Sequence, residues 1–196
     1  MEIVDLRSLH RRALKLATVT VERVTPADAT RSTPCPPWDL HALLAHLIGQ
    51  NHGFAAAVAG PGDAPLEAFA PRPPAADPAA EWAASAEQLT LAFADADLQR
   101  PVLLPEISAE HPFPAGVVIG FHLLDTVVHG WDVATALEVE YEPDDELVAA
   151  TLRVAQFVPT GSAREQPGAA FAPVLPVAVD AAPWPRTLAL LGRALR

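Results

Sequence analysis

The sequence contains a single cysteine, Cys35. One cysteine excludes an intramolecular disulfide framework and a cysteine-rich zinc module. A phosphate-cradling glycine loop, a dinucleotide-binding fingerprint and a Ser/His/Asp triad pattern are also absent from the sequence. Nucleotide-dependent chemistry and serine-hydrolase chemistry are therefore not indicated.

Basic residues are few. The chain has 13 Lys and Arg against 24 Asp and Glu, which gives a net charge of −11. This balance argues against a nucleic-acid partner and against binding to anionic membrane surfaces. With 51% hydrophobic and 19% charged residues in 196, the composition is that of a globular chain. The length fits one domain, or one domain with an extension.

No apolar run reaches the length of a membrane span without interruption by a charged residue or a histidine. The first five residues carry Glu2 and Asp5 and lack a long apolar core, so they do not resemble a signal peptide. We therefore expect a cytoplasmic protein without a membrane partner.

Helical periodicity and capping residues predict an all-α protein. Asp39 and the pair Asp77-Pro78 are well placed at helix starts. Residues 102–104 predict at most a short strand. The expected helices span residues 4–24, 39–59, 78–94 and 115–137, followed by shorter helices at 144–157 and 184–195. This pattern predicts an antiparallel four-helix bundle over about residues 1–140, with a C-terminal helical extension over about 141–196, in a single domain 1–196.

The most informative stretch lies in the apolar run 117–137. If this run is helical, four polar side chains share a narrow stripe at i, i+3, i+7 and i+10: His122, Asp125, His129 and Asp132. The other positions are almost all apolar, which is typical of a buried helix. A buried polar stripe needs partners, because unsatisfied polar groups are costly. The carboxylate of Asp125 and the imidazole of His129, one turn apart, indicate a metal ion as that partner.

A bundle normally supplies further ligands from a facing helix, and His46 is the candidate. Gly49, Gln50 and Gly53 follow on its face at i+3, i+4 and i+7. The glycines lower helix stability but leave room beside the imidazole, as an open site requires. Two alternatives stay open. In the first, His46 is a buried histidine, and the glycines beside it only allow close helix packing. In the second, Asp125 and His129 are a hydrogen-bonded pair in the core or a pair at the surface.

His122 and Asp132 are candidates for partners that orient a ligand imidazole, although for Asp132 we favour a helix end that reaches solvent. Cys35 precedes His46 by roughly 15 Å if the intervening chain is helical. We expect it to be a small, partly buried residue in a proline-rich turn, since no adjacent basic group lowers its pKa. The remaining histidines have no partner spacing and are expected at the surface or at helix ends: His10, His41, His52 and His111.

Two motifs resemble a known family. The run Thr33-Pro34-Cys35-Pro36-Pro37-Trp38-Asp39, followed by Leu43 to His46, resembles the opening of the DinB-like proteins related to mycothiol-dependent maleylpyruvate isomerase. The run Asp125 to Asp132 resembles their (D/E)-x-x-x-H-x-W-D helix. The segment Phe171 to Arg193 is similar to the end of a single-domain subfamily described only as metal-binding. The resemblance covers nearly the whole chain.

The resemblance implies a DinB-like four-helix bundle with a divalent metal at its mouth, ligated by His46, Asp125 and His129. Zinc is our first expectation, with nickel or iron as alternatives, because N/O sites select weakly by affinity. The resemblance also implies mycothiol or a similar small thiol as co-substrate and a small electrophile as acceptor. Asp125 stands where the isomerase has a glutamate, which is one methylene longer. The residues expected to flank or orient the thiol are Gly49, Gln50, Gly53 and His122.

Three functions remain open. The first is a thiol-dependent S-transferase or isomerase-like enzyme with a metal-activated thiolate. It is favoured because two histidines and one carboxylate leave metal positions open, as in catalytic zinc sites. The others are a non-catalytic metal-binding or sensory bundle and a structural bundle without metal. The sequence defines no oligomeric state, and a homodimer is kept as an alternative.

Overall fold

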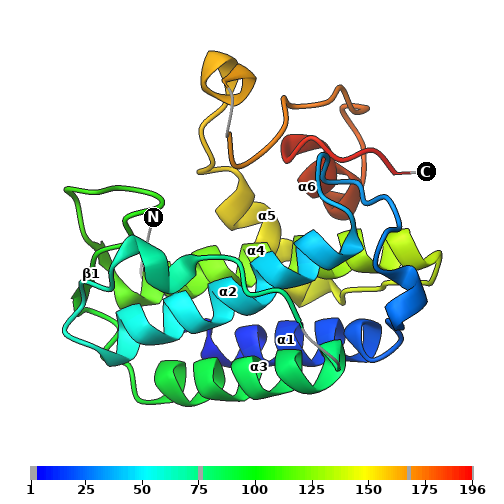
Figure 1. The fold of residues 1–196 in the computed structure, drawn as a ribbon. Coiled ribbons are helices and arrows are strands. Elements are labelled where there is room, and N and C mark those ends of the chain that lie inside the picture. The colour runs from blue at the N-terminus through cyan, green and yellow to red at the C-terminus, as the bar shows by residue number, and fades with distance from the viewer. Residues whose placement is uncertain (1–3, 75–76, 167–168, 196) are drawn as a thin grey trace. The chain divides into compact units, whose positions relative to one another are not determined.

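Four long helices make up the first of the chain's two compact units, which ends at Tyr141. They are α1 (Arg7–Val21), α2 (Leu40–Ala59), α3 (Pro78–Ala94) and α4 (Ala115–Leu137). The structure is a computed structural model that describes residues 4–74, 77–166 and 169–195 (Figure 1). The expected all-α bundle is confirmed, although α1 is shorter at both ends than the expected 4–24.

Local capping explains where these helices begin and end. The Asp39 side chain accepts a hydrogen bond from the backbone N–H of Ala42, and Asp77 accepts one from Ala80 in the same way. Pro78 occupies the first turn of α3, where a missing N–H costs nothing. At the end of α4, Glu138 adopts a left-handed conformation with φ 59°. Glycine usually takes that position.

The connection 60–77 determines the direction of α3. Its 3-10 turn η2 (Leu66–Phe69) packs on α2, and further along the connection the N–H of Arg72 donates to the Ala45 carbonyl at 2.8 Å. The chain thus returns to the beginning of α2 before α3 starts. As a result α2 and α3 lie side by side and run in the same direction (Figure 1). The reason for this common direction is the long connection between α2 and α3. The helical pattern alone does not predict the path of that connection.

Helix α4 lies against both α1 and α2. Among the described residues it is the one helix long and apolar enough to span a membrane, but 89% of its most apolar window is buried inside the protein. Before it, β1 (Pro101–Val102) pairs antiparallel with β2 (Phe113–Pro114). The loop between these two strands carries Glu106. The expected strand at 102–104 is therefore shorter and begins one residue earlier.

The second compact unit begins at Glu142. It contains α5 (Asp145–Ala155), the 3-10 turn η3 (Gly161–Glu165) and α6 (Pro183–Leu190), and α5 packs against α6. Asp144 caps α5 by accepting hydrogen bonds from the N–H groups of Glu146 and Leu147. The two expected C-terminal helices are present with shorter ends. That both units form one domain stays a prediction.

Candidate metal centre

Helices α2 and α4 bring three predicted ligands together: His46, Asp125 and His129, called the trio below. One ligand atom from each lies within 4.8 Å of the other two. The Asp125 Oδ1 atom is 3.5 Å from His46 Nε2 and 3.4 Å from His129 Nε2. The two imidazole rings meet edge to face, with centroids 5.1 Å apart. Both imidazoles therefore direct the same ring nitrogen toward one carboxylate oxygen.

These distances are longer than a strong hydrogen bond between nitrogen and oxygen, which is about 2.7–3.2 Å. The other oxygen of Asp125, Oδ2, is buried and has no hydrogen-bond partner. A buried oxygen without a partner is costly unless another group satisfies it. The trio thus has the form of a ligand set rather than of a closed hydrogen-bond network.

Asp132 orients His129. Its Oδ2 lies 2.8 Å from His129 Nδ1, and Asp132 has 0% exposure. The expectation that Asp132 reaches solvent at a helix end is wrong, because α4 continues to Leu137 and Cys35, from the turn before α2, lies within 4.8 Å of the Asp132 carboxylate. The alternative that the sequence left open, a partner that orients the imidazole, agrees with this geometry. In the neutral imidazole, with Nδ1 donating its proton to Asp132, the lone pair of Nε2 faces the rest of the trio.

The segment before α2 folds back over the site. The Thr33 hydroxyl donates to the Trp38 carbonyl at 2.8 Å, which closes the turn. The Trp38 ring packs on His46, with centroids 4.6 Å apart. The Cys35 Sγ, a His129 nitrogen and an Asp132 oxygen lie within 4.8 Å of one another. Sequence spacing placed Cys35 far from the site, and this is wrong because the turn replaces the helical path that the spacing assumed.

Electrostatics make the trio attractive to positive charge. Burial raises the pKa of Asp125, but the neighbouring imidazoles of His129 and His46 outweigh it and hold that pKa well below its usual range. Burial lowers the pKa of His129, but Asp125 and Asp132 raise it to about 9. Two carboxylates around one imidazole thus favour a cation at this position.

Glu106 is a neighbour of the site that the sequence analysis missed. Gln50, one turn after His46 on α2, donates from Nε2 to the Glu106 carboxylate at 3.0 and 3.3 Å. Burial raises the pKa of Glu106. The hydrogen bond from Gln50 and the charge of His46 lower it, and the charge of Asp125 raises it. Glu106 lies in the irregular loop between β1 and β2, where no periodic pattern reveals a contact with α2. The only signal in the sequence for a role of Glu106 at the site is that its side chain is a carboxylate.

Gly49 and Gly53 serve close packing. A Cβ at Gly49 would lie 2.4 Å from the backbone oxygen of Ala70, and one at Gly53 would lie 2.3 Å from the Phe69 ring. The space beside both glycines is therefore filled by η2 and the residue after it. This geometry agrees with the packing alternative, except that the partner is a turn and not a helix.

His122 belongs to a second polar cluster inside the bundle. Its Nδ1 lies 2.9 Å from His10 Nε2 of α1 and 3.0 Å from the Thr126 hydroxyl. Its Nε2 is buried without a partner, and burial lowers its pKa to about 4. His10 is 1% exposed, so its expected surface position is wrong; it pairs with His122 of α4, which is far away in the sequence but packs against α1. The polar stripe of α4 thus divides between two clusters.

Comparisons with protein sequences and with solved structures relate this chain to known proteins. Two uncharacterized proteins of Mycobacterium tuberculosis, one from each of two strains, are each 27% identical to it over 193 residues, which is 98% of this chain and 100% of each relative. The crystal structure of the mycothiol-dependent maleylpyruvate isomerase matches with a TM-score of 0.58 at 13% identity, covering 84% of this chain and 69% of that chain. A histidine-to-alanine mutant of the isomerase matches with a TM-score of 0.57 at 14% identity. These structural matches show a shared fold.

A family model gives the assignment. The model of the mycothiol maleylpyruvate isomerase N-terminal domain matches residues 10–134 of the 196. That range is well over half of the chain and includes the whole trio. The expected relationship is confirmed, and the chain belongs to the mycothiol maleylpyruvate isomerase N-terminal domain family.

Proposed function

We propose that the trio binds a divalent metal ion, with zinc as the first choice, and that the protein uses it to activate a small thiol for attack on an electrophile. The observation that carries the proposal is the separation of 3.4 and 3.5 Å between the histidine nitrogens and Asp125 Oδ1. Two ligands bound at about 2.1 Å to one tetrahedral zinc ion lie about 3.4 Å apart. Two of the three ligand distances therefore match a shared ion, and the ligand atoms of the two histidines lie within 4.8 Å of each other.

The donor set also fits an ion. Asp125 Oδ2 is buried without a partner, so the carboxylate has unused capacity. Two imidazole nitrogens and one carboxylate are ligands of catalytic zinc sites, which keep a further position for water or substrate. Nickel and iron suit the same donors and stay as alternatives.

The ion would lower the pKa of a bound thiol, so that the thiol reacts as a thiolate at neutral pH. The chain's own residues have three further roles. Asp132 holds His129 in the tautomer that directs Nε2 into the site. Trp38 packs on His46 and limits the rotation of its ring. Glu106, held by Gln50, accepts the thiol proton, because a carboxylate with a raised pKa is a better base than an ordinary one.

The identity of the thiol rests on relatives. The family and the solved structures carry mycothiol in their names, so mycothiol or a similar thiol is the proposed co-substrate. His122 faces His10 across the bundle, and Gly49 and Gly53 contact η2, so Gln50 is the expected thiol-orienting residue that best fits the site. A cytoplasmic location and a homodimer remain predictions.

Metal analysis is the first test. The purified protein should bind one zinc ion per chain, and His129→Ala and Asp125→Ala should each abolish stoichiometric binding while circular dichroism stays helical. His52→Ala is the matched control, because His52 lies on α2 and contacts Gln88 away from the trio. If His129→Ala binds zinc with unchanged stoichiometry and affinity, the ligand assignment is wrong.

The reaction is tested separately. Zinc-loaded protein is incubated with mycothiol and a chromogenic acceptor such as a halodinitrobenzene. We expect metal-dependent conjugation that disappears in His46→Ala and falls in Glu106→Gln with zinc retained. If zinc binds but thiol at millimolar concentration neither binds nor reacts, the protein is a non-catalytic metal-binding or sensory module.

A further inference from the structure

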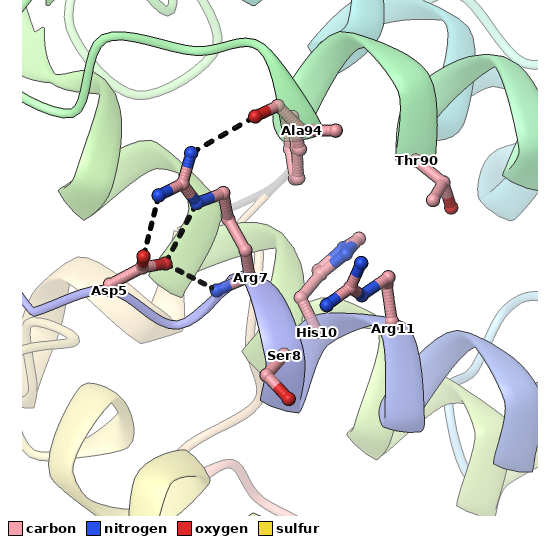
Figure 2. A pocket seen from close by; sticks show the side chains of 8 residues that line it. Asp5, Arg7, Ser8, His10, Arg11, Thr90 and Ala94 are labelled. Atoms are coloured by element: carbon pink, nitrogen blue, oxygen red, sulfur yellow. Dashed lines mark hydrogen bonds and ion pairs between the residues drawn. The ribbon is translucent and has the colours of Figure 1, made fainter.

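A cavity of about 370 Å³ opens between α1 and α3. None of its lining residues belongs to the trio, which lies on α2 and α4. Small-molecule sites usually occupy about 300–1,000 Å³, so this volume suffices for a compact ligand. The cavity is called the α1–α3 cavity below, and Figure 2 shows its side chains.

The charge of the α1–α3 cavity is opposite to that of the protein. Helix α1 carries four basic residues and no acidic one, whereas the whole chain has a net charge of −11. Two of these basic residues, Arg7 and Arg11, line the cavity. A local positive charge on an acidic protein attracts anions to that position.

The two arginines are in different states. Arg7 pairs with Asp5, with Nη2 and Oδ2 2.6 Å apart, and its Nη1 donates to the Ala94 carbonyl at 3.0 Å (Figure 2). This network neutralises Arg7 and fixes its position. Within the described residues the Arg11 guanidinium makes no hydrogen bond or ion pair, and its charge is one of those that lower the pKa of Asp5. The cavity therefore has one uncompensated positive charge.

Other lining groups define the shape of a ligand. Ser8 also lines the cavity and is exposed, one helical turn before Arg11, so its hydroxyl is available to donate to an oxyanion. Phe93 and Ala94 supply apolar surface, and the His10 ring contacts Phe93 at a tilt of 55°, with ring centroids 4.7 Å apart. The hydroxyl of Thr90 already donates to the Ala86 carbonyl at 2.8 Å, so toward a ligand it can only accept. The polar donors Arg11 and Ser8 come from α1, whereas the apolar surface of Phe93 and Ala94 comes from α3.

From these contacts we infer that the α1–α3 cavity is a binding site for a small organic oxyanion, with its carboxylate or phosphate on Arg11 and Ser8 and its apolar part against Phe93. The guanidinium presents two parallel N–H groups that match two oxygens of either anion. The inference does not depend on the metal or on the proposed reaction.

The test is calorimetric titration of the metal-free full chain at low salt with three probes: benzoate, phenyl phosphate and inorganic phosphate. We expect saturable one-to-one binding of at least one aromatic anion, more tightly than inorganic phosphate because of the apolar wall. Comparison of benzoate with phenyl phosphate distinguishes a carboxylate from a phosphate ligand. If no probe binds at millimolar concentration, or if the aromatic group adds no affinity, the inference is overturned.

Two variants give opposite expectations. Arg11→Gln should weaken binding about 10- to 100-fold, because it removes a charged hydrogen-bond donor. Asp5→Asn should strengthen binding, since it removes a carboxylate that repels the anion and neutralises Arg7. Lys15→Gln is the matched control: it removes the same charge from the exposed face of α1 without lining the cavity. If Lys15→Gln weakens binding as much as Arg11→Gln, attraction to α1 is nonspecific and the site is refuted.

Discussion

The Asp132→Asn substitution should weaken zinc binding while leaving the trio in place. Asp132 has 0% exposure, and its Oδ2 accepts the Nδ1 proton of His129 at 2.8 Å. Asparagine keeps the size of the side chain and removes its charge. Its amide group can also present N–H to Nδ1, which would move the imidazole proton to Nε2 and block the ligand atom.

The magnitude follows from this one hydrogen bond. A hydrogen bond to a charged group contributes about 1.5–3 kcal/mol. This corresponds to about 10- to 100-fold in dissociation constant. Loss of a partner that orients a metal-ligating histidine typically costs about 10- to 100-fold in metal affinity, so the two estimates agree. Full burial of Asp132 places the expected loss in the upper part of this range.

The assay is a zinc competition titration against a chelating dye near neutral pH, with circular dichroism to check the fold. Asp95→Asn provides the control, because it makes the same chemical change at an exposed residue after α3. Unchanged zinc affinity in Asp132→Asn, with the fold intact, would refute the argument that this carboxylate orients His129. A loss far above about 100-fold would contradict the estimate and indicate either that the imidazole proton has moved to Nε2 or that Asp132 is itself a ligand.

Three further predictions concern stability. Gly53→Ala should lower the free energy of unfolding by about 1–3 kcal/mol in a urea titration, because the new Cβ would lie 2.3 Å from the Phe69 ring. An unchanged free energy of unfolding would mean that η2 shifts to accommodate the Cβ at little cost. The pKa of His122 is about 4 when folded against 6.5 otherwise. Between these values only the unfolded chain binds this proton, so the contribution of His122 to stability should fall by about 3 kcal/mol as pH drops from 6.5 to 4; His10, whose pKa burial also lowers, adds a change of the same sign. His122→Gln should reduce that slope, and an identical pH profile would contradict the assignment. Glu138→Gly should raise the melting temperature by relieving about 1 kcal/mol of left-handed strain at φ 59°, and a lower value would show that the Glu138 side chain contributes more than the strain costs.

The trio shows how far sequence pattern reaches into a site. Asp125 and His129 lie one turn apart on α4, so their common face follows from helical geometry alone. His46 required a tertiary assumption, that α2 and α4 are neighbours, which the bundle fold supplies. The role of Asp132 was decided by burial, and burial depends on what covers the last turns of α4.

The sequence by itself determined the helices, because capping residues and apolar periodicity are local: Asp39 and Asp77 accept hydrogen bonds from their own helices. The tertiary structure decided the surroundings of both sites. Cys35 and Glu106 come from irregular segments, and His10 meets His122 from another helix. Such positions depend on long-range packing, which local patterns do not encode, since a loop's path is set by the surfaces that it contacts rather than by its own backbone preference.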